Sequence, residues 1–273
     1  MSNISSQGIS YKLTETEFKL LPYLDSRLFL ETAMARFNGW VSPFDRNYLD
    51  WPRRIEIQEK MCQSLRLALS QNLSSLKKKN SLKVIYLGAA LGSITSYFTL
   101  NVLKNFDLLE KTEVYLYDLL VEPLMLTKQG FFEFTEEAAQ DCKISNTFSP
   151  LEYKNTLKNA TLISGNIINL PEDLKDFDIV IAPYIHHHLN IYDKRKACQE
   201  MQRITAPGGI ILIGDLTFNY QGFKDWLLYH KVEDLPYALE CFIPIEDHIG
   251  FFKKPKIIDQ FKGDIFYNFS LII

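Results

Sequence analysis

The sequence predicts an α/β fold in which a mostly parallel β-sheet is covered by helices on both faces. From residue 81 onward, short apolar runs of strand length alternate with helix-compatible stretches, and this alternation is typical of a parallel sheet. The first strand runs directly into a small-residue turn that contains two glycines, and a helix follows it. An aspartate, a Gly-Asn pair and a histidine triplet come directly after later strands. Residues 1–80 show no convincing strand and predict a helical cap.

The N-terminal region predicts helices and one loop that is rich in aromatic side chains. Helices are expected over residues 14–24, 26–36 and 54–77, and the last of these keeps a continuous apolar side. The loop over residues 37–54 contains Gly, Pro and Asn together with five aromatic residues. Such a loop either packs as a structured cap or lines a pocket, and the two alternatives are compatible.

Six strands are expected in the remainder of the chain. They cover residues 84–87, 113–117, 161–164, 178–182, 210–214 and 264–273. Because the last strand ends the chain, it is expected to pair with the sheet, antiparallel at or near an edge. Helices are expected from residue 121 with a continuation over 131–142, within 143–158 and 234–249, and over 193–205 and 223–230. Pro207-Gly208-Gly209 is expected to stop the helix over 193–205.

Composition and charge limit the class of protein. The net charge of -3 and the pI of about 6.0 provide no general attraction to nucleic acid. Four scattered cysteines without a CxxC pair fit a reducing cytoplasm and argue against a disulfide scaffold or a cysteine zinc site. The N-terminus has no signal pattern, and no apolar run approaches the roughly 20 residues of a membrane helix. We therefore expect a cytoplasmic protein with neither nucleic acid nor membrane as a partner.

The ends of the predicted strands bring together residues that suit an adenosine-containing ligand. In an open parallel sheet, ligands bind beyond the carboxyl ends of the strands. Gly88 permits a sharp turn after the first strand, and Gly92 lets the following helix pack close to it. Asp118, at the end of the second strand, is placed to accept two hydrogen bonds from ribose hydroxyls, and Asn166 can meet the edge of an adenine.

Five motifs carry a family resemblance over residues 81–215. In order, they are residues 87–92, Asp118, Gly165-Asn166, the segment from Phe177-Asp178 to His187-His188-Leu189, and Ala206-Pro207-Gly208-Gly209. In order and spacing this pattern resembles the class I S-adenosylmethionine-dependent methyltransferases. The resemblance implies a Rossmann-like, mostly parallel seven-stranded sheet. It also implies S-adenosylmethionine as the cofactor and methyl transfer to oxygen or nitrogen of a small-molecule acceptor.

The resemblance also assigns roles to single residues. The implied cofactor-binding residues are Gly88, Ala89, Ala90 and Gly92 at the methionine part, Asp118 and Leu119 at the ribose, Asn166 and Ile167 at the adenine, and Pro183 near the sulfonium. His187 and Tyr184 are the catalytic candidates. The chain departs from the family pattern at Tyr86, where an acid is usual, at Ala90, where glycine is usual, and at Asn166, where aspartate is frequent. Two alternatives therefore stay open: a non-catalytic adenosine-binding module, and a cofactor-bound enzyme that catalyses a non-methylating reaction.

Three interpretations of the triplet His186-His187-His188 stay open. Neighbours on a helix diverge by about 100°, so the three rings cannot all face one metal, and a metal site would need an outside carboxylate such as Asp215. The histidines could instead cap a helix or satisfy buried backbone groups. His187 is the first choice for a general base beside the acceptor. No metal site is predicted, and Asp215 is expected only to cap the segment after it.

The expected organisation is a cap joined to one catalytic domain. Residues 1–80 would form a helical, substrate-covering region, and residues 81–273 would form the methyltransferase domain. Within that domain, residues 215–250 would be a substrate-covering insertion that covers the acceptor together with the aromatic loop. The expected partner is the small-molecule acceptor, and a homodimer is an open alternative.

Overall fold

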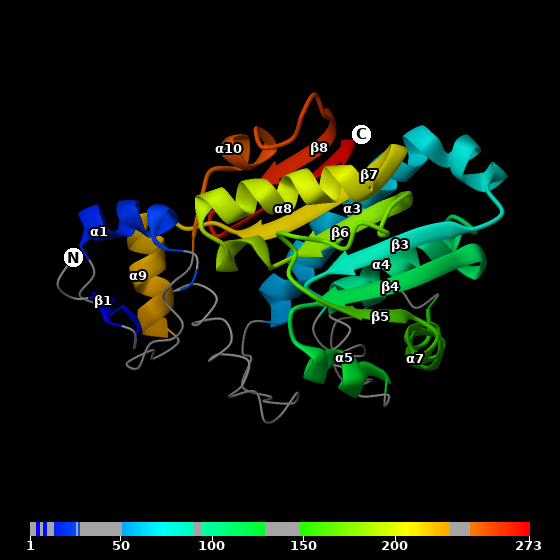
Figure 1. Cartoon of the computed structure of the whole chain (residues 1–273), viewed down its shortest axis with the longest axis horizontal. Coiled ribbons are helices and arrows are strands. Elements are labelled where there is room, and N and C mark those ends of the chain that lie inside the picture. The colour runs from blue at the N-terminus through cyan, green and yellow to red at the C-terminus, as the bar shows by residue number, and fades with distance from the viewer. Residues whose placement is uncertain are drawn as a thin grey trace.

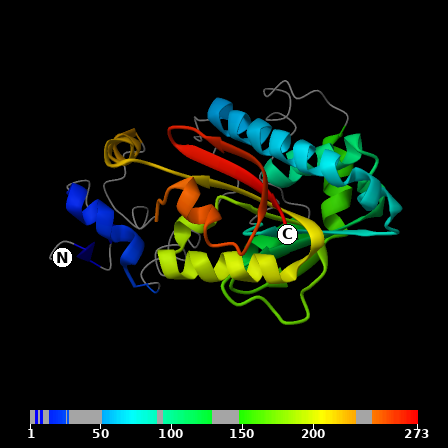
Figure 2. The ribbon, with the colours of Figure 1, turned by 90° about the horizontal axis from the view of Figure 1, so that it is seen from above.

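The computed structural model describes residues 4–5, 8–9, 14–25, 27, 51–89, 94–128, 148–229 and 241–273 of the chain. Within these residues, helices cover both faces of a seven-stranded sheet, as Figure 1 and Figure 2 show. This confirms the expected α/β fold class. The helix expected over 26–36 (apart from Arg27), most of the aromatic loop and the continuation over 131–142 lie outside the described residues.

The sheet has the strand order β5-β4-β3-β6-β7-β9-β8. The strands are β3 (Leu82–Leu87), β4 (Thr112–Asp118), β5 (Thr161–Ser164), β6 (Phe177–Pro183), β7 (Thr205–Leu216), β8 (Lys256–Lys262) and β9 (Phe266–Ile272). The first five strands are parallel, and β9 runs antiparallel to both β7 and β8. The antiparallel last strand was expected. The strand order reverses between β3 and β6, which is where open α/β sheets bind their ligands.

Three sequence expectations about strands are wrong. β7 begins at Thr205, directly after the preceding helix, because the Pro207-Gly208-Gly209 segment is accommodated as a bulge between two paired regions of β6 and β7. β8 was missed because this edge strand is largely exposed and mixes charged with apolar residues. The N-terminal region contains a two-residue antiparallel pair, β1 (Ile4–Ser5) with β2 (Gly8–Ile9).

Alternate residues of the central strands enter two separate apolar clusters. Val84 and Tyr86 of β3 pack towards α3 (Trp51–Lys78) and α4 (Ile94–Asn105), whereas Ile85 and Leu87 pack on the side of α8 (Ile191–Ile204) and α10 (Ile245–Ile249). This follows from the two-residue period of a strand. We call these sides the α3 face and the α8 face, and Figure 2 shows the sheet between them. α3 lies in the expected cap region and packs on the sheet, and the division into two regions stays a prediction.

The remaining helices lie around this core. They are α1 (Glu15–Leu20), η1 (Leu21–Tyr23), η2 (Leu109–Lys111), α5 (Val121–Lys128), α7 (Pro150–Lys158), η3 (His186–His188) and α9 (Tyr220–Tyr229). α1 and α9 lie side by side beyond the carboxyl ends of the parallel strands (Figure 1). The Phe18 ring contacts those of Phe223, at a centroid distance of 5.5 Å, and Tyr220, at 5.8 Å. In the part of the chain that the structure describes, no helix has the length and apolar character to span a membrane.

Candidate functional site

The turn after β3 is built around a glycine in the left-handed region. Gly88 has a φ of +74°, and the backbone N–H groups of Gly88 and Ala89 both donate to the carbonyl oxygen of Tyr117, at 2.8 and 3.0 Å. A Cβ atom at Gly88 would lie 2.4 Å from Cδ1 of Ile185, so a larger residue does not fit without a shift. The end of β3 is therefore fastened to β4 and lies against the segment after β6.

Two of the predicted turn residues cannot be placed. Ala90 and Gly92 lie outside the described residues. Tyr86, where the family usually has an acid, is completely buried on the α3 face, and its hydroxyl lies 2.7 Å from the hydroxyl of Thr99 on α4. Its contacts therefore join β3 to α4.

Asp118 ends β4 and is half-buried at the carboxyl edge of the sheet. Its Oδ1 accepts a hydrogen bond from the Leu120 N–H at 3.1 Å, and its carbonyl oxygen accepts from the Gly165 N–H at 2.9 Å. Leu119 is 36% exposed, and its carbonyl oxygen accepts from the Ser164 hydroxyl at 3.3 Å. These contacts hold the Asp118 carboxylate beside the end of β5.

The segment after β5 passes close to Tyr117. The Tyr117 hydroxyl donates to the carbonyl oxygen of Asn166 at 3.2 Å, and a Cβ atom at Gly165 would lie 2.2 Å from that hydroxyl oxygen. The side-chain oxygen of Asn166 accepts from the Ile168 N–H at 3.1 Å, and Ile167 is buried. Burial raises the pKa of Tyr117 to about 12, so the hydroxyl keeps its proton.

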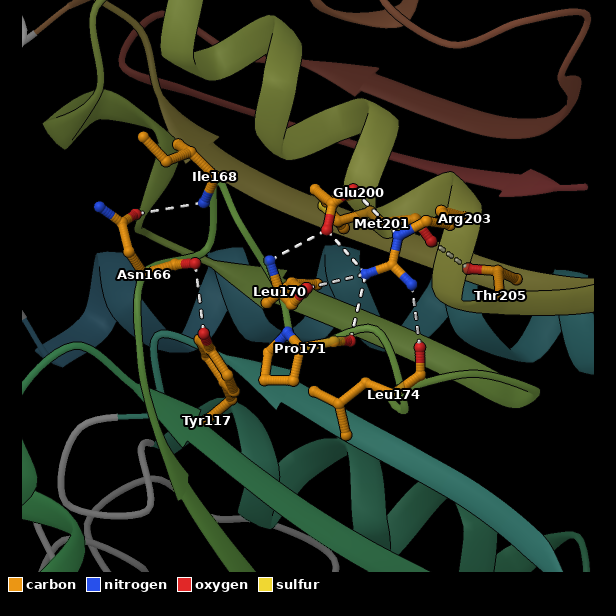
Figure 3. Close-up of polar contacts among 10 residues, drawn as sticks. All are labelled: Tyr117, Asn166, Ile168, Leu170, Pro171, Leu174, Glu200, Met201, Arg203 and Thr205. Atoms are coloured by element: carbon orange, nitrogen blue, oxygen red, sulfur yellow. Dashed lines mark hydrogen bonds and ion pairs between the residues drawn. The ribbon is translucent and has the colours of Figure 1, made fainter.

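An ion pair on α8 anchors this segment, as Figure 3 shows. Glu200 accepts from the Leu170 N–H at 2.9 Å, and Arg203 donates to the carbonyl oxygens of Leu170, at 3.1 Å, and Leu174, at 3.3 Å. Arg203 also contacts Glu200 at 2.7 Å and lowers the pKa of its carboxyl. Sequence reasoning missed this pair because i,i+3 charges on a helix usually face solvent. The pair fixes the loop that carries Asn166 to a helix of the core.

The turn after β6 places Tyr184 in an unusual backbone conformation. Pro183 is buried, and Tyr184 has a φ of +51°, which is uncommon for a bulky side chain. The Tyr184 N–H donates to the Gly214 carbonyl oxygen at 2.8 Å. The hydroxyl of Tyr184 accepts from Gln58 Nε2 at 3.3 Å, and its ring lies 5.9 Å from that of Phe266. These contacts tie Tyr184 to α3 and β9, and its catalytic role stays a prediction.

The histidine triplet forms η3, and two of its rings are buried. His187 is only 3% exposed, and its Nδ1 lies 2.6 Å from Oδ1 of Asp215 at the end of β7. The same oxygen accepts from the Leu216 N–H at 3.0 Å. Asp215 therefore does cap the next residue, but the expectation that it does only this is wrong. It also orients His187, because η3 follows β6 and Asp215 lies at the end of the neighbouring strand β7.

A buried lysine completes this arrangement. Lys194 of α8 has no exposed surface, and its Nζ donates to the carbonyl oxygens of His186, at 2.6 Å, and Cys241, at 3.2 Å. Nζ also lies 3.8 Å from Oδ2 of Asp215. Burial raises the pKa of the Asp215 carboxyl, and the Lys194 charge opposes that rise. The Cys241 N–H in turn donates to the His187 carbonyl oxygen at 2.8 Å. η3, α8 and the segment before α10 are thus joined.

Comparisons with known proteins agree with this geometry. A family profile described as a methyltransferase domain matches residues 128–252. Uncharacterized methyltransferases from Alkaliphilus oremlandii and Oceanobacillus iheyensis are each 29% identical to the chain, over 86 and 71 residues, which are 32% and 26% of this chain. These matches span 39% and 33% of the length of the two relatives, so the chain covers well under two thirds of either.

One solved structure shares the fold across most of its length. The N-methyltransferase NodS from Bradyrhizobium japonicum WM9, in complex with S-adenosyl-L-homocysteine, is 14% identical, and the match covers 88% of this chain and 97% of that one. The TM-score is 0.50, and the likeness shows the fold. The strand order and this likeness show the fold of an S-adenosylmethionine-dependent methyltransferase, and the profile and the relatives show that part of the chain is similar to methyltransferases.

Proposed function

We propose that the protein transfers a methyl group from S-adenosylmethionine to an oxygen or nitrogen atom of a small-molecule acceptor. The observation that carries this proposal is the position of the Gly88 turn beside Asp118. Leu87 and Tyr117 are paired in register, so the turn and the carboxylate each follow the last pair of β3 and β4. Both lie at the carboxyl edge, where the strand order reverses.

The residues at this edge fit the cofactor. The turn at Gly88 packs closely against Ile185 of the segment after β6, which fixes its backbone at the carboxyl edge of the sheet. We assign the ribose hydroxyls to the carboxylate of Asp118, and the adenine to Asn166 and Ile167 on the loop anchored by α8. The side-chain oxygen of Asn166 already accepts from Ile168, so the amide nitrogen is the group assigned to the adenine.

The pair His187–Asp215 supports an acceptor that must lose a proton. When bound, S-adenosylmethionine supplies an electrophilic methyl group on a sulfonium. The hydrogen bond to Asp215 favours the His187 tautomer with the proton on Nδ1, so that Nε2 is the basic nitrogen. A base of this kind accelerates transfer to a hydroxyl or an ammonium group and matters less for a neutral amine. The remaining task of the site is to align the acceptor atom with the methyl carbon.

The segments beyond the strand ends are the proposed acceptor cover. α9 lies within the expected insertion over residues 215–250, and it packs against α1 at this end of the molecule. An apolar contact between Phe18 and Phe223 joins the two helices. We assign this pair, together with the aromatic loop, to holding a small acceptor over the edge.

Calorimetric titration of S-adenosylmethionine and S-adenosylhomocysteine tests the cofactor site. We expect binding on the order of micromolar by the wild type, and a loss of about 10- to 100-fold in Asp118→Ala, because hydrogen bonds to a carboxylate are lost. Glu113→Ala is the matched control, since Glu113 is exposed near the opposite end of β4. No binding by folded wild type, or equal binding by Asp118→Ala, would refute the site.

A methyl-transfer assay tests the base. Candidate acceptors are screened by the mass gain of one methyl group, and His187→Gln is compared with the wild type on the acceptor found. We expect kcat to fall by about 10²- to 10⁴-fold without a change in cofactor affinity. Cofactor binding without methylation of any acceptor would favour one of the two alternatives, the adenosine-binding module or the cofactor-bound enzyme that catalyses a non-methylating reaction.

A further inference from the structure

Three buried side chains with nitrogen or sulfur donors converge on the α8 face. His186 of η3, Cys198 of α8 and His248 of α10 are all without exposed surface. His186 Nδ1 lies 2.7 Å from His248 Nε2 and 3.9 Å from Cys198 Sγ, and the three donor atoms lie within 4.8 Å of one another. The proposed methyl transfer uses none of these groups.

Packing alone does not account for this cluster. Burial lowers the pKa of His186 to about 3 and the pKa of His248 well below its ordinary value, and it raises the pKa of the Cys198 thiol. The two rings share one hydrogen bond, yet Nε2 of His186 has no hydrogen-bond partner among the described residues. Buried polar groups of this kind are costly, and apolar side chains would fill the same space at a lower cost.

The donor set has the chemistry of a zinc ligand set. Neutral imidazole nitrogens and a thiolate bind Zn²⁺, whereas Mg²⁺ and Ca²⁺ prefer oxygen. We propose that His186, Cys198 and His248 bind one zinc ion. The ion takes the place of the proton between the two rings, and that proton moves to the other nitrogen of the ring that carries it, so both imidazoles stay neutral. The thiol proton of Cys198 is released to solvent, and no oxidation state changes. Three protein ligands leave the fourth tetrahedral position to a non-protein donor such as water.

The geometry requires only a small rearrangement. Zn–N bonds of about 2.0–2.1 Å in a tetrahedral site place two nitrogens roughly 3.3 Å apart, so the rings must separate by roughly 0.6 Å. His248 Nδ1 already lies 2.7 Å from the Tyr267 hydroxyl, and metal-bound histidines usually make such a second hydrogen bond. The charges of Lys194 and Asp215 act on the Cys198 thiol in opposite directions, and the Lys194 charge, which favours the thiolate, acts more strongly.

A metal at this site would hold η3, the segment that carries the proposed base His187, in place. His186 precedes His187 directly, and the ion would join η3 to α8 and α10 in the core. Because the ligands are fully buried, we expect the ion to enter during folding. The free energy of zinc binding then adds to the free energy of unfolding of the protein. This role does not depend on methyl transfer, and it is measurable without an acceptor.

The test is to refold the wild type with a chelator or with one equivalent of Zn²⁺, and then to measure bound zinc and thermal stability. We expect one zinc per chain and a Tm higher by about 5–10 °C at a hundredfold excess over the Kd. Refolding with Co²⁺ should give thiolate-to-metal absorption. Wild type that retains no zinc after refolding, or that shows no such absorption with Co²⁺, would overturn the proposal.

Variants locate the site. Cys198→Ala and His248→Gln should lose the stoichiometric zinc, whereas Cys62→Ala, which removes a buried thiol on the α3 face, should keep it. Tyr267→Phe keeps the ring and removes the hydroxyl, and it should weaken zinc binding about 10- to 100-fold. Equal loss in Cys62→Ala and Cys198→Ala would contradict the assignment. If the Cys198 and His248 variants do not fold, zinc binding by Tyr267→Phe and the Co²⁺ spectrum of the wild type show whether the proposed site binds metal.

Discussion

The two faces of the sheet bury different kinds of polar side chain. On the α3 face the buried polar contacts include two neutral pairs, the hydroxyls of Tyr86 and Thr99 at 2.7 Å and those of Ser96 and Tyr153 at 2.6 Å, and one contact with a carboxylate, from the Ser64 hydroxyl to Asp259. On the α8 face they join groups that can carry charge or bind metals: His186, His187, Lys194, Cys198, Asp215 and His248.

The difference between neutral and ionisable buried groups indicates which face provides packing and which face provides function. Neutral hydroxyl pairs cost little to bury when they are hydrogen-bonded, whereas buried ionisable groups are costly unless each is paired. The sheet could be covered on both sides by apolar residues, as most of each cluster shows. The ionisable groups gather where β6 and β7 end, beside the predicted base His187. We infer that the α8 face holds the proposed base His187 and the groups that orient it, and that the α3 face mainly provides packing.

The largest expected effect comes from the buried lysine. Lys194→Met removes the donor to two buried carbonyl oxygens and leaves Asp215 without its cation, so the free energy of unfolding should fall by about 3–5 kcal/mol. Lys196→Met, two residues along α8, changes an exposed lysine and should cost less than about 0.5 kcal/mol. Urea denaturation of the wild type and the two variants measures both values, and similar losses in the two variants would show that the buried contacts of Lys194 do not stabilise the α8 face as proposed.

The second expected effect is a pH dependence of the free energy of unfolding, caused by the buried histidines on the α8 face. Burial lowers the pKa of His186 to about 3, whereas an unperturbed histidine titrates near 6.5. Between these two pH values the unfolded chain binds more protons than the folded chain. The contribution of His186 to the free energy of unfolding is therefore complete above pH 6.5 and is lost as the pH falls towards 3. His186 and His248, whose pKa values are both lowered by burial, each add a slope of up to about 1.4 kcal/mol per pH unit.

Denaturation of metal-free protein at pH 6.5, 5.8 and 5.0 measures this slope. The free energy of unfolding should fall by about 1.6 kcal/mol for each of His186 and His248 over this range. His248→Gln should show a flatter profile, and His188→Gln, which changes a half-buried ring, should follow the wild type. A wild-type profile without slope in this range would mean that His186 and His248 are not held neutral.

The smallest effect is expected on the α3 face. Tyr86→Phe removes a hydroxyl whose partner, Thr99, keeps its hydrogen bond to the Thr95 carbonyl oxygen at 2.7 Å. The loss should be about 1 kcal/mol and should be equal at pH 7 and pH 5, because both groups stay neutral. A loss that changes with pH would show that this face also contains a group whose titration matters.

The sequence predicted the features that local pattern determines. Buried parallel strands are continuous apolar runs, so β3, β4, β5 and β6 were predicted to within about two residues, and Gly88 and Asp118 follow directly from the ends of two of them. The glycine turn itself is only partly described, so the predicted places of Ala90 and Gly92 stay predictions.

Contacts between distant segments could not be predicted in this way. A lysine on an amphipathic helix usually faces solvent, and only the packing of α8 against η3 shows that Lys194 is buried. His186, Cys198 and His248 come from three elements without a local metal-binding spacing, so no motif joins them. β8 was not predicted because a partly exposed edge strand lacks the apolar run of the buried strands.

The central claim is that the carboxyl edge of β3 and β4 holds S-adenosylmethionine, and a crystal structure with S-adenosylhomocysteine tests it most directly. We predict the ribose hydroxyls at about 2.7–3.0 Å from the carboxylate oxygens of Asp118, the adenine beside Asn166 and Ile167, and the methionine part over the Gly88 turn. Ligand bound at another edge of the sheet, or a ribose that makes no contact with Asp118, would contradict the account.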